Sequence, residues 1–178
     1  MAPRICGADI NGTATSTANF PQLALGYAHR RARVFWFWWT GMVFALPGAA
    51  QAAVLWATDQ NPENGLVLAG LGLGISGVGC VSAVGPRFTR TAPRPADDVN
   101  RAEQYIRIVP NSAIAMVVIM LAFVAALSFL APEGLSPEAL PVSAFLVAFP
   151  LPVAAGMLYS RHLHRERERL YRSWLERG

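Results

Sequence analysis

Four long apolar stretches alternate with polar segments along this chain of 178 residues. They cover residues 34–57, 65–85, 113–131 and 139–160, and none of them contains Asp, Glu, Lys, Arg or His. A hydrocarbon core of about 30 Å is crossed by about 20 apolar residues in a helix, so each stretch is near or above the required length. Buried helices of soluble proteins are commonly shorter and carry a polar stripe. The pattern predicts an all-α integral membrane protein with a bundle of four transmembrane helices.

We expect a single transmembrane domain at 34–160, with polar segments before it, within it and after it. Residues 1–33 form an N-terminal segment that we expect to be mostly flexible, with a short interfacial helix starting at Pro21. Residues 86–112 connect the second and third transmembrane helices, and residues 161–178 form a basic helical tail. No segment outside 34–160 is apolar enough to build a second core.

The connecting segment 86–112 contains one amphipathic pattern. Its apolar positions recur at helical spacing at Val99, Ala102, Ile106 and Val109. This spacing predicts a short amphipathic helix on the cytoplasmic face. Pro110 follows directly, and we expect it to separate this helix from the third transmembrane helix.

The charge pattern orients the chain. All fifteen basic residues are arginines, and they fall in segments 1–33, 86–112 and 161–178, whereas the loops 58–64 and 132–138 carry only acidic charges. Arginines next to transmembrane helices favour the cytoplasmic side, where they also meet anionic lipid head groups. The sequence therefore predicts a multi-pass plasma or inner membrane protein with both termini in the cytoplasm. The expected interface anchors are Arg30, Arg31, Arg33, Trp36, Trp38, Trp39, Arg161 and Trp174.

A second interpretation of the first apolar stretch remains open. Arginines precede it, and Ala50-Gln51-Ala52 has the small-residue pattern of a signal-peptide cleavage site. A leader of 52 residues would be unusually long, and apolar residues continue to Ala57. An uncleaved transmembrane helix is therefore favoured over cleavage after Ala52.

The second stretch is rich in small residues at a spacing of four. Gly70 and Gly74 form a GxxxG step, and Gly72, Ser76 and Cys80 form another small stripe. Small faces let helices approach closely within lipid. The two stripes predict a central helix that packs on two sides.

Three prolines and one amide interrupt the apolar pattern. Pro47 lies within the first stretch, and Pro150 and Pro152 lie within the fourth, where each removes a backbone donor and is expected to bend the helix. Gln51 is the most polar side chain of the first stretch. We expect it to hydrogen-bond inside the bundle, because an unpaired amide in lipid is costly.

The chain offers no recognisable catalytic or metal-binding motif. Cys6 and Cys80 lack metal-ligand spacing, and His162 and His164 face different sides of the expected helix. No catalytic residue, cofactor or metal ion is predicted, so an enzyme is disfavoured. The net charge of +4 does not indicate nucleic-acid binding, because the arginines flank apolar stretches.

Three classes of function differ in how well they fit these features. The leading hypothesis is a small accessory or scaffold subunit of a larger membrane assembly, with a membrane-protein partner or further copies of itself. A passive transporter or oligomeric channel for a small neutral solute is the first alternative, since glycine faces and kinked helices permit clefts. A membrane-embedded enzyme is the second, disfavoured because the stretches lack carboxylates and histidines.

Overall fold

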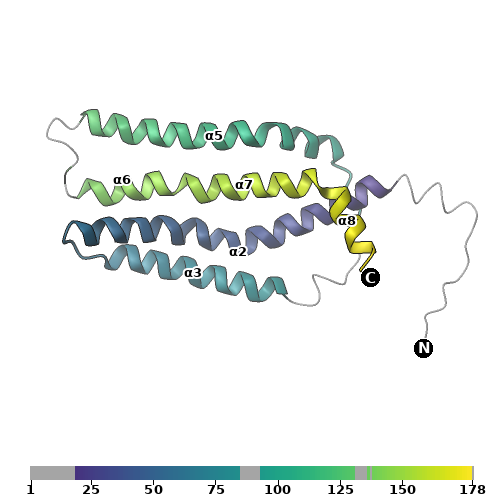
Figure 1. Ribbon diagram of the computed structural model, residues 1–178, viewed down its shortest axis with the longest axis horizontal. Helices are drawn as coiled ribbons and strands as arrows, with labels where there is room; N and C mark the ends of the chain where they lie inside the picture. The colour runs from purple at the N-terminus through teal and green to yellow at the C-terminus, as the bar shows by residue number, and fades with distance from the viewer. Residues whose placement is uncertain (1–18, 85–92, 131–135, 137, 178) are drawn as a thin grey trace, which may run out of the picture.

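The computed structural model describes residues 19–84, 93–130, 136 and 138–177. Within these residues the regular elements are helices, and no strand occurs. The helices are α2 (Phe20–Ala57), α3 (Glu63–Val84), α5 (Val99–Leu130), α6 (Ala139–Ala148), α7 (Pro150–Arg165) and α8 (Arg167–Leu175) (Figure 1). Taking α6 and α7 together, four of the described helical stretches are long and apolar enough to cross a membrane. The predicted all-α multi-pass chain is confirmed at this level, whereas the predicted flexibility before Phe20 falls largely outside the described residues.

A short structured turn joins α2 to α3 as an antiparallel hairpin. The Thr58 hydroxyl donates to the Val54 carbonyl at 2.9 Å and closes the end of α2. Asp59 adopts a left-handed φ of 55°, which short polar residues tolerate better than most. The Asn61 side-chain oxygen then accepts the Glu63 N–H at 3.0 Å and caps the start of α3.

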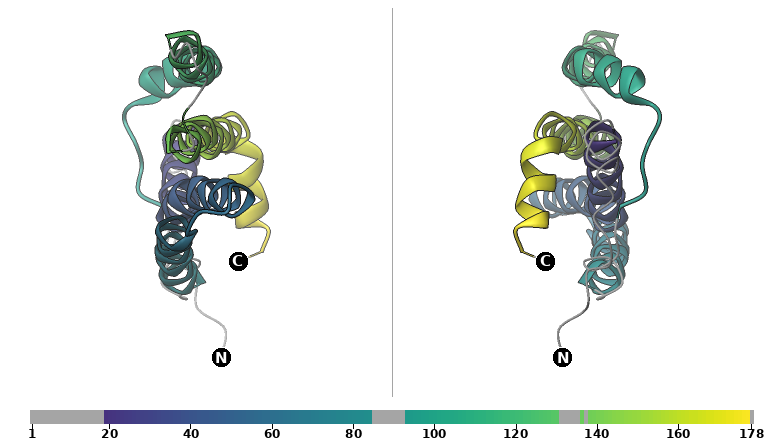
Figure 2. Two further views of the ribbon diagram at one scale, coloured as in Figure 1. Left: turned by 90° about the vertical axis from the view of Figure 1, so that its left-hand side faces the viewer. Right: turned by 90° about the vertical axis from the view of Figure 1, so that its right-hand side faces the viewer.

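The central helix is α2, rather than the predicted second transmembrane helix. Among the described elements α2 contacts α3, α5, α6, α7 and α8, whereas α3 contacts α2 alone. Figure 2 shows α3 on one side of α2, with α7 and α5 on the other. Among the described helices only α2 meets α3, so α3 is not the central helix of this chain, and packing of its second small-residue face stays a prediction.

Two helices are longer than predicted. The short interfacial helix expected at Pro21 and the amphipathic helix expected before Pro110 are not separate elements, because they are the first turns of α2 and α5. At 1.5 Å per residue α2 is about 57 Å long and α5 about 48 Å, well above a hydrocarbon core of about 30 Å. Both helices therefore extend beyond the apolar layer.

The fourth helical stretch is interrupted at its prolines. α6 ends at Ala148 and α7 begins at Pro150, with Phe149 between them still in helical backbone conformation. The interruption therefore lies in the hydrogen-bond ladder, because Pro150 and Pro152 have no backbone N–H to donate. The chain continues in nearly the same direction through it (Figure 1).

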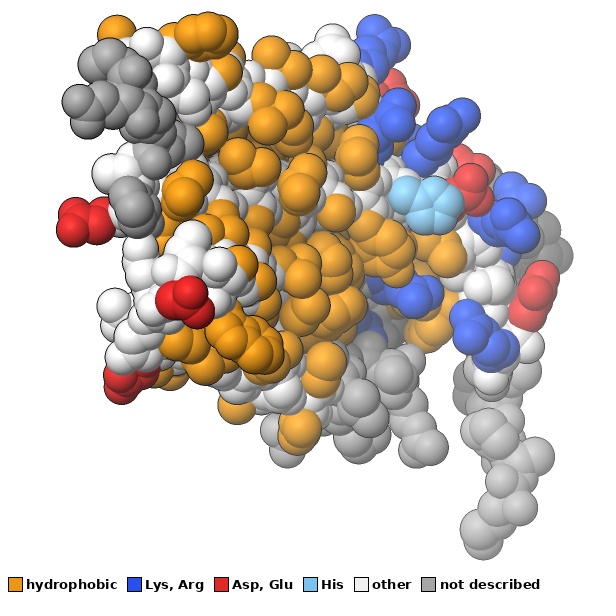
Figure 3. Space-filling model, turned by 60° about the vertical axis from the view of Figure 1, so that its left-hand side comes forward, with side chains coloured by type: hydrophobic (Ala, Val, Ile, Leu, Met, Phe, Trp, Pro, Cys, Tyr) orange, Lys and Arg blue, Asp and Glu red, His pale blue; other side chains and the backbone are white. Residues whose placement is uncertain are grey.

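Charge separates the two ends of the molecule. One end, which we call the arginine end, contains the starts of α2 and α5, the end of α7 and all of α8 (Figure 1). The opposite acidic end carries Asp59, Glu63 and Glu138. Figure 3 shows the blue arginines gathered at one end with acidic side chains among them, acidic side chains without arginines at the other end, and a continuous apolar surface between the two.

Candidate functional site

An aromatic core holds the arginine end together. Tyr171 of α8 is buried and lies against Phe20 and Tyr27 of α2, with ring centroids 5.4 and 6.1 Å apart. Trp174 lies against Tyr27 at 6.0 Å and stacks on Tyr171 at 5.8 Å. Trp174 was expected to be an interface anchor, but its ring is half-buried in this core. The amphipathic α8 is thus folded against α2.

The segment before α5 crosses α2 at a glycine. A Cβ atom on Gly26 would overlap the Arg94 carbonyl oxygen, so only glycine fits at this crossing. The Ala96 N–H donates to the Gln22 carbonyl at 3.1 Å. Pro93, which directly precedes Arg94, is buried. These contacts fix the start of α5 against α2.

Arg161 explains how α5 continues through a proline. Pro110 has no N–H, so the Ile106 carbonyl one turn earlier loses its helical donor. The Arg161 Nε–H of α7 donates to that carbonyl at 2.8 Å. Arg161 was expected to anchor the chain at the lipid interface, and in the structure it also links α7 to α5.

A small pocket opens where α2, α5 and α7 meet at the arginine end. It has a volume of about 290 Å³, and its lining residues, which we call the histidine pocket, are His29, Asp98, Arg101, Ala102, Tyr105 and His164. The rings of His29 and His164 have centroids 5.0 Å apart, and Tyr105 lies 5.5 Å from His164. His164 is only 6% exposed, although an arginine-rich stretch begins directly after it.

Hydrogen bonding defines the state of His164. Its Nδ1–H donates to the Ser160 carbonyl at 2.7 Å, because a carbonyl can only accept. The neutral ring therefore carries its free lone pair on Nε2. Within the described residues this nitrogen has no hydrogen-bond partner.

The surroundings of His29 favour its neutral form. Burial lowers the pKa of His29 below its ordinary value of 6.5, and His164 lowers it further. Asp98 raises the pKa and Arg33 lowers it. The unfolded chain therefore takes up this proton at a higher pH than the folded chain. Folding stability must then fall as the pH drops from above 6.5 through the lowered pKa.

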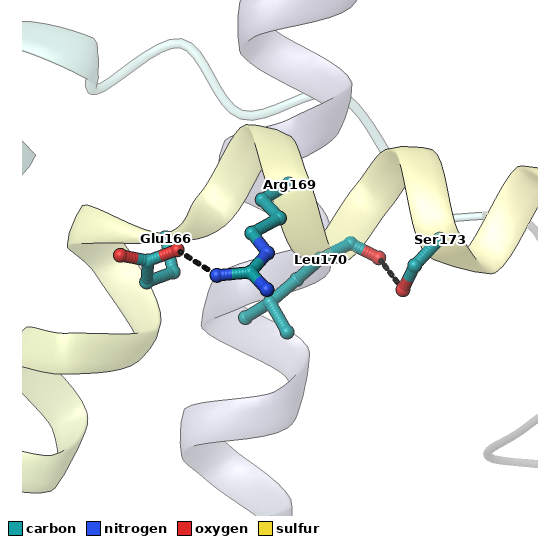
Figure 4. A network of polar contacts seen from close by, with 4 residues as sticks. All are labelled: Glu166, Arg169, Leu170 and Ser173. Carbon is teal, nitrogen blue, oxygen red and sulfur yellow. Dashed lines mark hydrogen bonds and ion pairs between the residues drawn. The ribbon is translucent and has the colours of Figure 1, made fainter.

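A wider groove lies on the other side of His164, between α5 and α8. Its volume is about 670 Å³, and four arginines and four glutamates line it together with His164. Three of the arginines are paired: Arg167 with Glu103 at 3.5 Å, Arg169 with Glu166 at 3.7 Å, and Arg172 with Glu168 at 3.7 Å. Figure 4 shows the second pair beside the hydrogen bond from Ser173 to the Leu170 carbonyl. The groove is charge-balanced and is therefore a poor site for a free anion.

The residues of the two predicted small-residue stripes differ in whether they contact α2. Gly72 lies against Gly41 and Ala45 of α2, and the Ser76 hydroxyl donates to the Trp38 carbonyl at 2.8 Å. Gly70, Gly74 and Cys80 point elsewhere. A Cβ on either of these two glycines would meet nothing within 4 Å, and Cys80 is exposed. The described residues of this chain therefore do not pack against them, and their packing role stays a prediction.

Two glycines of the α2–α3 contact were missed by the sequence analysis. Gly65 lies against Ala52, and Gly79 lies against the backbone of Phe37 and Trp38. Positions 65, 72, 76 and 79 follow a spacing of seven, four and three. A search along a helical face, rather than for GxxxG alone, would have found this stripe.

The aromatic cluster after the arginines is more than an interface belt. The Trp39 indole N–H donates to the Pro152 carbonyl of α7 at 2.7 Å. Trp36 and Trp39 also pack on Gly156, where a Cβ would come within 2.7 Å of either ring. Trp38 is half-buried and lies edge-on to Phe35 at 5.3 Å. The predicted anchors Trp36 and Trp39 therefore join α2 to α7.

The remaining predicted residues have simpler surroundings. Pro47 is buried inside α2, which continues through it without a break. Gln51 is half-buried, and within the described part of the chain its amide has no hydrogen-bond partner, so the predicted bond is not found. Arg31 and Arg33 are exposed and Arg30 is half-buried, all in the first half of α2.

The histidine pocket brings two imidazole rings together at the arginine end. The described residues contain no group of three or more His, Cys, Asp or Glu side chains able to hold a metal ion. The sequence analysis missed the histidine pocket, because His29 and His164 are 135 positions apart and only folding brings them together. Comparisons with protein-family models, curated proteins and solved structures find no match.

Proposed function

We propose that the protein is an accessory or scaffold subunit of a larger membrane assembly, with α5 as a main contact surface. The observation that carries this proposal is the exposure of α5. Only 6% of its most apolar 18-residue window is buried, against 39% for α2, 22% for α3 and 28% for α6 and α7 together. A helix in a closed bundle normally buries a full stripe.

The exposed surface of α5 is large and bulky. Between Ala115 and Leu130 the half-buried side chains are Met116, Val117, Met120 and Val124, and the rest are exposed. Ile119 is 65% exposed and Phe123 50%. In lipid such faces are satisfied either by acyl chains or by another protein helix. The outward face of α3 with Gly70 and Gly74 offers a second surface for close helix contact.

The arginine end faces the cytoplasm in this proposal, so both termini are cytoplasmic in a plasma or inner membrane. Basic residues next to transmembrane helices support this orientation, and the exposed Arg31 and Arg33 would meet anionic head groups. Reporter fusions at the C-terminus test it. A cytoplasm-active fluorescent fusion should be bright and an export-dependent phosphatase fusion inactive. The reverse pattern would contradict the orientation.

A solute path has less support than a partner surface. The two pockets described above lie at the arginine end. Close glycine contacts between α2 and α3, and the tryptophans on Gly156, fill the helix interfaces that a path would need.

Solubilisation in a mild detergent followed by native mass spectrometry tests the proposal. The chain, with a mass of 19.2 kDa, should appear in a complex with a second membrane protein at fixed stoichiometry. A complex whose mass is a multiple of this chain alone would indicate a homo-oligomer. A lone monomer under all mild conditions would contradict an accessory role.

A further inference from the structure

The histidine pocket joins three helices through groups that titrate or carry charge. His29 belongs to α2 and His164 to α7, while Asp98 precedes α5 and Arg101 and Tyr105 lie in its first turns. The positive charge of Arg33 in α2 also lowers the pKa of His29. The pocket thus contains a single acidic side chain among its described lining residues.

The other side of His164 offers no excess of negative charge. The groove there is lined by Glu103 of α5 and by residues at the end of α7 and along α8, in equal numbers of arginines and glutamates. Arg167 of α8 and Glu103 already form an ion pair. A second positive charge at the two histidines would therefore have little compensation beyond Asp98.

We propose that His29 and His164 form an acid-sensitive latch. While both rings are neutral, the latch keeps the junction between α7 and α8 packed against α2 and α5. Protonation of both rings would place two cations with centroids 5.0 Å apart, close to Arg33 and Arg101. Like charges at this distance in a partly desolvated pocket repel one another. The latch then opens.

The movement is transmitted to α8 by the local geometry. His164 lies one residue before the end of α7, and Glu166 leaves helical conformation with φ −89° and ψ 13° before α8 begins. A displacement of His164 therefore shifts the attachment point of α8. The lowered pKa of His29 agrees with a latch that is closed near neutral pH.

Hydrogen–deuterium exchange of the full-length protein in lipid nanodiscs tests the latch. Exchange of the α8 amides is compared at pH 7.5 and pH 5.5 after correction for the intrinsic pH dependence of the reaction. Carboxylates stay largely ionised in this range, since their ordinary pKa values are near 4. We expect corrected exchange in α8 to accelerate at least fivefold at pH 5.5, with α3 unchanged as an internal reference.

Three variants separate the latch from a general acid effect. His29→Asn and His164→Asn should each weaken the response, and the double variant should abolish it while retaining slow exchange at both pH values. His162→Asn is the matched control, because His162 is exposed and does not line the pocket. The latch is refuted if the wild type shows no acceleration, if the double variant still accelerates, or if His162→Asn removes the response.

Discussion

The α2–α3 hairpin and helix α5 use apolar residues in opposite ways. In the hairpin, small residues at Gly41, Gly65, Gly72 and Gly79 bring backbones into contact, and the bulky side chains of α3 point outward. In α5, bulky side chains cover most of the surface, and a narrow stripe meets the rest of the chain. In lipid, burial of bulky apolar groups gives little preference for protein over acyl chains, so close backbone approach decides which helices hold together. The hairpin is held by close backbone contact along its length, whereas α5 is held chiefly near the arginine end.

The largest expected effect comes from breaking the hairpin. Gly72→Leu places a side chain where a Cβ would lie 2.5 Å from the Ala45 nitrogen. Overpacking of this kind costs about 3 kcal/mol. Gly74→Leu is the matched control, since a Cβ there meets nothing within 4 Å. Steric trapping in bicelles measures the free energy of unfolding of both variants. Equal losses of stability in the two variants would contradict the α2–α3 interface described here.

The attachment of α5 can be weakened through Arg161. Arg161→Met removes the donor to the Ile106 carbonyl and leaves this acceptor unpaired, which should cost about 2 kcal/mol. Pro110→Ala restores a backbone N–H for the same carbonyl. In the Pro110→Ala background the Arg161→Met change should therefore cost much less, as measured by a double-mutant cycle. Additive losses would show that Arg161 does not compensate for the proline.

A smaller effect is expected where α2 meets α7. Trp39→Phe removes the indole N–H that donates to the Pro152 carbonyl and should cost about 1 kcal/mol. Trp56→Phe is the control, because Trp56 is 79% exposed on the same helix. Thermal unfolding of both variants in one detergent makes the comparison. A loss of stability for Trp56→Phe as large as that for Trp39→Phe would contradict a stabilising role of the hydrogen bond from Trp39 to Pro152.

The smallest effect is expected on the surface of α8. Glu168→Gln breaks the ion pair with Arg172, whose two side chains are 52% and 67% exposed, and should cost about 0.3 kcal/mol. The same thermal unfolding assay should barely register this change. A loss above that of Trp39→Phe would contradict the small contribution assigned to this exposed pair within α8.

Local pattern predicted the apolar helices but not their partners. Stretch length and the absence of charge located all four candidate membrane-spanning segments, because these properties depend on each segment alone. Pro110 misled the prediction of a helix boundary, because its missing N–H is compensated by Arg161, 51 positions later. Spacing alone could not tell the stripe with Gly72 from the stripe with Gly70, since both are equally small. The histidine pocket depends on the crossing of α2, α5 and α7, which no local pattern contains.

Site-specific photo-crosslinking in native membranes tests the central contrast most directly. A photoreactive residue at Ile119 of α5 is compared with one at Phe37 of α2, since the two native side chains are 65% and 64% exposed. The account predicts a discrete protein adduct from Ile119 and only lipid adducts from Phe37. Lipid adducts alone from Ile119 would contradict the assignment of α5 as a partner-binding surface.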